Sequence, residues 1–142
     1  MSSGLLGDLF LFLDMVSFRF PKREKLAHRK LWEEVFRKGR TVKAYPLLLY
    51  YLETPLPEPV PFQAGFAVPK RSFRKAVQRN RIKRLMREAF RLEKPGTFNN
   101  TKGSFAFVIL YIGREMPDFE GVSKATNILL KKFDSHEAVT ED

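Results

Sequence analysis

Cysteine is absent from the 142-residue sequence. Its absence excludes disulfide bonds, thiolate nucleophiles and cysteine-based zinc sites. It also fits a reducing cytoplasm, which is where we expect the protein to reside. Histidine is nearly absent as well, because His28 and His136 are the only two and lie far apart in the chain. A histidine-based metal site or catalytic triad is therefore not expected.

Acidic residues are scarce relative to basic ones, with 16 Asp and Glu against 26 Lys and Arg. The resulting net charge of +10 favours a polyanionic partner, either nucleic acid or an anionic membrane surface. A long apolar run is missing too. The apolar stretch within residues 1–19 is interrupted by Asp8 and Asp14 and is shorter than the roughly 18 residues of a membrane span. We expect no membrane partner.

The length of the chain is typical of one domain. Hydrophobic residues make up 44% of it and include 14 Phe, enough for one well-packed core. No internal repeat divides the sequence. We predict a single domain over residues 20–134. Residues 1–19 are expected to be an extension that is loosely packed or not native, and residues 135–142 an acidic, flexible tail.

The spacing of apolar residues predicts two amphipathic helices besides the basic stretch described below. The first covers residues 21–39, where Gly39 is well placed to end the helix, and the second covers residues 121–133. The apolar positions are Leu26, Leu31, Trp32, Val35 and Phe36 in the first helix, and Val122, Ile128, Leu129 and Phe133 in the second.

Three segments rich in β-branched, aromatic and aliphatic residues predict strands: residues 41–53, 63–70 and 104–113. Proline cannot donate a hydrogen bond to a neighbouring strand. Pro46 therefore marks either an edge position or a break between two short strands. Strands and helices alternate along the chain, so we predict one α/β domain.

Residues 75–91, KAVQRNRIKRLMREAFR, contain seven Lys or Arg and a single acid, Glu88. Advancing by 100° per residue places Ile82, Leu85, Met86, Ala89 and Phe90 on one buried stripe and most of the cations on the opposite side. An ordinary solvated helix usually mixes charges of both signs. A helix that binds a polyanion is therefore the preferred interpretation. Lys70, Arg71, Arg74 and Lys75 extend the basic surface toward the N-terminus of the helix.

RNA fits this basic helix better than DNA does. A helix-turn-helix needs a second short helix just before the recognition helix, yet the preceding residues 63–70 are strand-like. A basic zipper needs a coiled coil after the basic region, yet Pro95-Gly96 follows here. RNA-binding modules more often combine a sheet with basic helices and exposed aromatic residues. We expect no DNA partner.

Residues 64–91 resemble the signature region of the bacterial ribonuclease P protein subunit. The family pattern is a strand that ends in a basic turn, followed by Ala-Val, Arg-Asn-Arg and a further Lys-Arg-x-x-Arg. Its counterparts here are Pro69-Lys70-Arg71, Ala76-Val77, Arg79-Asn80-Arg81 and Lys83-Arg84 with Arg87. The first helix is similar as well, because Trp32 and Phe36 match its two aromatic positions and Tyr50 matches an aromatic residue on the next strand. The resemblance extends from about Phe20 to Phe133.

The resemblance implies a fold and a function. The fold would be a small α+β sandwich of the ribosomal protein S5 domain 2-like type, with a mixed sheet of about four strands and about three helices. Its strand–helix–strand crossover would be left-handed, against the usual rule. The protein would be the RNA-binding subunit of an endoribonuclease, ribonuclease P. It would assist a catalytic RNA in removing the 5′ leader of precursor tRNA.

The resemblance also implies roles for individual residues. No residue of the protein would be catalytic, because the chemistry would belong to Mg²⁺ ions bound mainly by the partner RNA. Trp32, Phe36 and Tyr50 would line a cleft for the single-stranded 5′ leader of precursor tRNA. The basic residues that would contact RNA are Lys70, Arg71, Arg74, Lys75, Arg79, Arg81, Lys83, Arg84, Arg87 and Arg91, together with Asn80.

Two alternatives stay open at this point. Trp32 and Phe36 have the i, i+4 spacing of ordinary core residues, so they are either buried in the core or available to the leader. A structural RNA-binding protein of the ribosomal type, without a role in cleavage, would also account for the basic helix. It would not account for an aromatic cleft combined with the complete signature.

Overall fold

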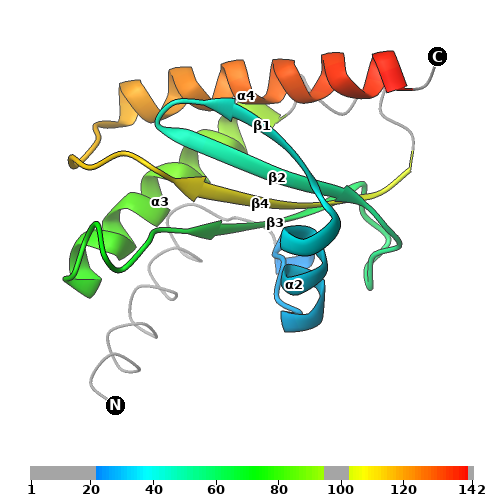
Figure 1. Cartoon of the computed structure of the whole chain (residues 1–142), viewed down its shortest axis with the longest axis horizontal. Helices are drawn as coiled ribbons and strands as arrows, with labels where there is room; N and C mark the ends of the chain where they lie inside the picture. The colour runs from blue at the N-terminus through cyan, green and yellow to red at the C-terminus, as the bar shows by residue number, and fades with distance from the viewer. Residues whose placement is uncertain (1–21, 95–102, 141–142) are drawn as a thin grey trace.

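A computed structural model describes residues 22–94 and 103–140 (Figure 1). The predicted extension, residues 1–19, lies outside the described residues. In chain order the elements are the short 3₁₀ helix η1 (Lys22–Glu24), α2 (Arg29–Lys38), β1 (Arg40–Ala44), β2 (Leu47–Glu53), β3 (Phe62–Ala67), α3 (Ala76–Glu93), β4 (Phe105–Tyr111) and α4 (Phe119–Thr140).

The strands form one mixed sheet in the order β1-β2-β4-β3. β1 pairs antiparallel with β2, and β2 pairs antiparallel with β4. β3 and β4 are parallel neighbours, and α3 lies between them in the sequence. The predicted four-stranded mixed sheet with its strand–helix–strand crossover is thus confirmed. The left-handed sense of the crossover stays a prediction.

Helices cover both faces of the sheet. α3 and α4 pack against each other and against one face, and α2 packs against the other (Figure 1). Side chains alternate along a strand, so Phe105, Phe107 and Ile109 of β4 face α3 and α4, whereas Ala106 and Val108 face α2. The sheet therefore separates a large core from a smaller one.

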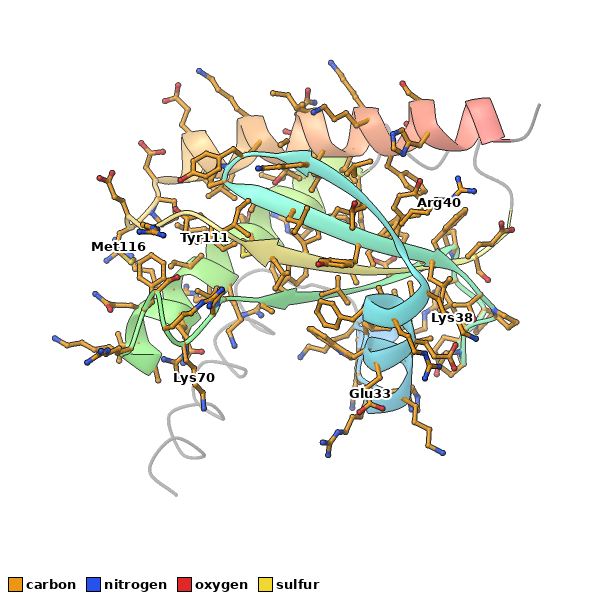
Figure 2. The ribbon with its side chains drawn as sticks, in the orientation of Figure 1. Glu33, Lys38, Arg40, Lys70, Tyr111 and Met116 are labelled. Carbon is orange, nitrogen blue, oxygen red and sulfur yellow. The ribbon has the colours of Figure 1, made fainter. Side chains whose placement is uncertain are left out.

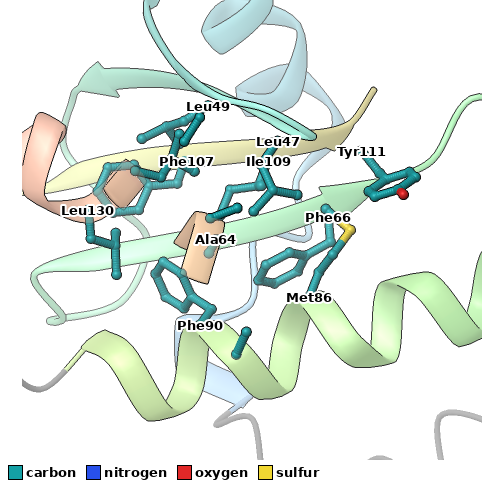
Figure 3. Packing of buried hydrophobic residues seen from close by; sticks show 14 of the residues in the cluster. Leu47, Leu49, Ala64, Phe66, Met86, Phe90, Phe107, Ile109, Tyr111 and Leu130 are labelled. Carbon is teal, nitrogen blue, oxygen red and sulfur yellow. The ribbon is translucent and has the colours of Figure 1, made fainter. Parts of the chain in front are cut away.

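Phenylalanine rings fill the larger core (Figure 3). Phe90 of α3 meets Phe62 of β3 edge to face at 5.4 Å between ring centroids, and Phe133 of α4 meets Phe107 of β4 at 4.9 Å. Such edge-to-face pairs add about 0.5–1.5 kcal/mol each beyond burial of the ring area. They hold α3 and α4 in fixed positions on the sheet.

The predicted strand over residues 41–53 is divided in two. β1 ends at Ala44, β2 begins at Leu47, and a turn with a cis Tyr45–Pro46 peptide bond connects them. Of the two alternatives left open for Pro46, an edge position or a break, the structure shows the break. The turn is fixed to the end of β4, because the backbone N–H of Ile112 donates to the carbonyl oxygen of Pro46 at 2.8 Å.

The first predicted helix begins later than residue 21. The backbone before α2 is hydrogen-bonded to the outer edge of β3 instead. Lys25 forms a parallel bridge with Ala64, and the N–H of Leu26 donates to the Ala64 carbonyl at 3.0 Å. The side-chain amide of Gln63 also donates to the Arg23 carbonyl at 2.9 Å. These long-range bonds keep residues 25–28, between η1 and α2, out of helical structure, so α2 starts only at Arg29.

The other edge of the sheet is covered at one point by a side chain. The ammonium group of Lys132, on α4, donates to the carbonyl oxygen of Lys43 on β1 at 2.6 Å. An acceptor on each outer strand, Ala64 on β3 and Lys43 on β1, is therefore already bonded.

The last helix differs from the prediction in two ways. Ile128 was expected on the buried stripe but is 49% exposed. The buried face of α4 contains Leu130 in its place, beside Val122, Leu129 and Phe133. The helix is also longer than predicted, since it runs from Phe119 to Thr140, and the flexibility expected for residues 135–142 stays a prediction. Burial of Phe133 and a 3.2 Å hydrogen bond between His136 Nδ1 and the Tyr51 hydroxyl extend the contact of α4 with the sheet.

Candidate nucleic-acid interface

Helix α3 is fixed to the sheet by its apolar stripe. Ile82, Met86, Ala89 and Phe90 are buried, and Leu85 packs at the margin of the core (Figure 3). The predicted stripe is therefore confirmed. Since one side of the helix is committed to the core, its cations are displayed on a rigid surface.

The predicted basic residues differ in how far solvent reaches them. Lys70, Arg71, Arg74, Lys75 and Arg81 are exposed; Arg79, Asn80, Lys83, Arg84, Arg87 and Arg91 are half-buried. The exposed group gathers in the turn before α3 and in the first turns of the helix. A polyanion that approaches this end of α3 therefore meets cations with little desolvation to overcome.

Arg79 has a structural contact of its own. Its Nη1 atom donates to the carbonyl oxygens of Phe73 and Arg74, each at 2.8 Å. The guanidinium thereby closes the turn that leads from β3 into α3. The predicted RNA-contacting role of Arg79 stays a prediction, and the structure adds that this side chain shapes the turn that carries Arg71 and Arg74.

Arg91 is already paired. Its Nη2 and Nε atoms donate to the two carboxylate oxygens of Glu88 at 2.6 and 3.3 Å, in a two-pronged contact. The hydrogen bond to Glu88 raises the pKa of Arg91 above its ordinary value. Glu88 therefore neutralises positive charge in the C-terminal part of the basic surface.

The three predicted aromatic residues lie together on the opposite side of the sheet. Phe36 of α2 meets Tyr50 of β2 edge to face at 4.9 Å between ring centroids, and Trp32 lies 6.2 Å from Phe36. Phe36 is 42% exposed, and Trp32 and Tyr50 are half-buried. None of the three side chains is fully buried, and their contact with the leader stays a prediction.

Trp32 is held in place from two directions. Its indole Nε1–H donates to the carbonyl oxygen of Leu26 at 2.8 Å. Its ring lies against the backbone of Gly65 on β3, so close that a Cβ at that position would be 2.3 Å from Cζ2 of the indole. Glycine at position 65 thus provides the space for the tryptophan ring.

A hollow of about 260 Å³ joins the aromatic cluster to the basic helix. Its lining includes Trp32, Gly65 and Lys25, together with Lys83 and Arg87 of α3. The two groups of residues assigned separately from the sequence therefore meet across the β3 edge. An aromatic face beside two cations is suited to a nucleotide, whose base can stack while its phosphate is bound.

The electrostatics of this hollow favour an anion. Burial lowers the pKa of Lys83 from its ordinary value, and the nearby charges of Arg87 and Arg79 lower it further. Each cause disfavours a positive charge on Lys83 in the free protein. A phosphate in the hollow would reverse this effect, because an opposite charge nearby stabilises the protonated amine.

Magnesium ions prefer several oxygen ligands held in a near-octahedral arrangement. Among the described residues, no group of three or more His, Asp or Glu is placed to hold a metal ion. In the same part of the chain, no helix combines the length and hydropathy of a membrane-spanning segment.

The profile of the ribonuclease P family matches residues 20–134. The chain belongs to this family. The ribonuclease P protein component of Dictyoglomus thermophilum is 32% identical over 124 residues, which cover 87% of this chain and 97% of that protein. The component from Porphyromonas gingivalis is 32% identical over 112 residues, which cover 77% of this chain and 82% of that protein.

Solved structures agree with the family assignment. The ribonuclease P protein of Thermotoga maritima superposes with a TM-score of 0.63 at 25% identity and covers 78% of this chain and 97% of that one. The Staphylococcus aureus protein has the same fold, with a TM-score of 0.63 at 20% identity and coverage of 79% and 96%. The family match and the curated relatives are consistent with a subunit of ribonuclease P, and the ribosomal-type alternative is not favoured.

Sequence reasoning missed three features of this site. Gly65 was not singled out, although a glycine amid bulky strand residues often marks a close approach. Lys25 was not placed at the interface either, because its position depends on pairing with Ala64, far away in the sequence. The position of Lys83 and Arg87 beside Trp32, apart from the more exposed cations, was missed as well, because it depends on the packing of α2 beside β3.

Proposed function

We propose that this protein binds the catalytic RNA of ribonuclease P through the basic surface of α3 and the single-stranded 5′ leader of precursor tRNA through Trp32, Phe36 and Tyr50. The observation that carries the proposal is the hollow in which Trp32 meets Lys83 and Arg87. Stacking on unpaired bases is worth about 1–3 kcal/mol per base and tolerates varied sequence, which suits leaders that differ between precursors.

In this proposal the protein positions the substrate and the catalytic RNA performs the cleavage. Magnesium would supply an activated water and stabilise the leaving oxygen, and we propose that it is held mainly by RNA. The exposed cations of α3, Arg81 among them, would neutralise phosphates of the catalytic RNA. The half-buried pair in the hollow would neutralise phosphates of the leader.

The experiment is cleavage of precursor tRNA at low Mg²⁺ with the protein alone, a bacterial ribonuclease P RNA alone, and both together. We expect leader removal only, or far faster, in the mixture. Cleavage by the protein alone would contradict the assignment of the chemistry to RNA. Binding of the RNA without any change in cleavage would contradict a role in the reaction.

Leader recognition needs a separate measurement. In the assembled enzyme, Phe36→Ala should weaken binding of precursor tRNA about 5-fold or more, because one stacking partner is lost, and should leave binding of mature tRNA unchanged. Lys131→Ala, which removes an exposed cation from α4, is a matched control. Equal weakening for precursor and mature tRNA would contradict the leader assignment.

A further inference from the structure

Residues 22–28 form a strap along the outer edge of β3 and lead into α2. Three contacts fix the strap to the strand: the bridge between Lys25 and Ala64, the hydrogen bond from the Leu26 N–H to the Ala64 carbonyl, and the hydrogen bond from the Gln63 amide to the Arg23 carbonyl. The strap therefore follows a defined path beside β3, and its side chains have defined positions relative to the strand.

An ion pair joins this strap to α3. The ammonium group of Lys94, at the C-terminal end of α3, donates to the carboxylate of Glu24. The two side chains are only 19% and 18% exposed, and Lys94 Nζ lies 5.4 Å from the centroid of the Phe62 ring. Salt screens a partly buried pair much less than an exposed one. The pair is therefore suited to holding the strap and the helix together.

Lys94 lies on the same face of α3 as the two cations of the hollow. Lys83, Arg87 and Lys94 are spaced i, i+4 and i+11, which places them along one side of a helix over about 17 Å. Lys83 and Arg87 line the hollow, whereas Lys94 is bonded to Glu24. The pair therefore lies at the end of the row of cations and outside the hollow itself.

The strap also helps to build the opposite side of the hollow. Lys25, Leu26 and Ala27 belong to its lining, together with Trp32. The carbonyl oxygen of Leu26 accepts the hydrogen bond from the Trp32 indole N–H at 2.8 Å. A displacement of the strap would therefore displace the indole ring relative to α3.

We infer that Glu24 and Lys94 are positioning residues for the hollow. Their ion pair sets the spacing between the Trp32 ring on one side and the cations Lys83 and Arg87 on the other, so that the base and the phosphate of one nucleotide are bound together. Neither member of the pair lines the hollow, so both act through the strap. The inference rests on the proposed function of the hollow and adds the residues that hold its two sides in place.

The first test is spectroscopic. Trp32 is the single tryptophan of the sequence, so its fluorescence reports on the hollow in the free protein. Glu24→Gln keeps the shape of the side chain and removes its charge. We expect a red shift of the Trp32 emission and stronger quenching by acrylamide, because the strap is released from α3.

Glu33→Gln is a matched control for the loss of an ion pair. Glu33 lies on α2 (Figure 2) and pairs with Arg29 at 3.8 Å, with both side chains largely exposed. An exposed pair of this kind contributes little to stability. Glu33→Gln should therefore leave the Trp32 emission and its quenching unchanged.

The second test uses the assembled enzyme. Glu24→Gln should weaken binding of precursor tRNA about 5-fold or more, the value of one stacking contact. It should leave binding of mature tRNA and of the catalytic RNA unchanged. KM should rise with kcat unchanged, because the pair affects binding of the substrate and not the chemical step. A general loss of folded protein would lower all of these activities together.

Reversal of the charges keeps the test decisive where a single variant is unstable. Glu24→Lys places two cations together and should have a larger effect than Glu24→Gln. In the double variant Glu24→Lys with Lys94→Glu the pair is restored in the opposite direction, which should recover much of the native emission and affinity. The inference is wrong if the folded double variant recovers neither. It is also wrong if Glu24→Gln lowers the thermal midpoint without a change in Trp32 fluorescence.

Failure of this inference differs from failure of the proposed function. If Phe36→Ala weakens binding of precursor tRNA while Glu24→Gln changes neither binding nor fluorescence, the leader site stands and the positioning role is overturned. If Glu24→Gln changes the fluorescence but neither variant weakens binding, the pair positions Trp32 and the proposed leader site is wrong.

Discussion

The indole ring of Trp32 occupies the space that a side chain at Gly65 would fill, since a Cβ there would lie 2.3 Å from Cζ2 of the ring. We predict that Gly65→Ala displaces the indole and lowers the free energy of unfolding by about 1–3 kcal/mol, as overpacking does. Chemical denaturation measures this loss, and binding of precursor tRNA should weaken in parallel.

A double-mutant cycle separates this cause from a general effect of the added methyl group. With Trp32→Leu in the background, Gly65→Ala should cost much less, because the smaller side chain leaves room for the new Cβ. Equal losses in both backgrounds would show that the tryptophan ring is not what the glycine accommodates.

Arg79 and Arg81 lie two residues apart on α3 and should respond differently to substitution. Arg79 closes the turn before the helix through two backbone carbonyls, so Arg79→Ala should destabilise the RNA-free protein by about 1–3 kcal/mol. Arg81 is exposed, so Arg81→Ala should leave thermal unfolding unchanged. It should lower the logarithmic salt slope of RNA binding by about 0.7–0.9. Identical behaviour of the two variants would contradict the structural role of Arg79.

Glu88 should weaken RNA binding in the natural protein because it neutralises Arg91. We predict that Glu88→Gln raises the affinity for the catalytic RNA by a few-fold and steepens its salt dependence, since one more cation becomes available. Filter binding at several salt concentrations measures both. An unchanged or reduced affinity would place Arg91 outside the RNA contact.

We predict that the charge of Lys83 destabilises the RNA-free protein but strengthens binding of precursor tRNA. Its pKa is lowered from 10.5, so the folded chain holds this proton less tightly than the unfolded chain does. Protonated Lys83 therefore opposes folding at neutral pH, and the opposition fades as pH rises from the lowered pKa toward 10.5. Lys83→Met should raise the thermal midpoint of the RNA-free protein at pH 7 and weaken binding of precursor tRNA.

The gain in midpoint from Lys83→Met should shrink as the pH is raised, because the natural side chain then loses its charge. The gain is limited to about 1 kcal/mol or less, since solvent screens a half-buried charge. A lower midpoint at pH 7 would show that the ammonium group is stabilising in the hollow.

Local patterns in the sequence were sufficient for the parts of the fold that depend on neighbouring residues. The buried stripe of α3 follows from helical periodicity alone, and the break at Pro46 follows from the missing proline N–H. Ile128 shows the limit of this reasoning. It is apolar and adjacent to the stripe, but the direction from which the sheet covers α4 decides that Leu130 is buried instead.

The candidate site depended more on long-range packing. The resemblance grouped Trp32 with Phe36 and Tyr50, and the structure brings them together. The hollow that Trp32 shares with Lys83 and Arg87 arises because α2 and α3 approach the same edge of β3 from different parts of the chain. Residue spacing carries no information about such a meeting.

The bonded acceptors on the two outer strands have a consequence for the protein before it meets its RNA. An open sheet edge can add a strand from another molecule and so begin aggregation. Here the backbone N–H of Leu26 donates to the Ala64 carbonyl on one outer strand, and the ammonium group of Lys132 donates to the Lys43 carbonyl on the other. These two acceptors are therefore closed to pairing with a strand of another molecule, which makes aggregation through either edge less favourable at these points.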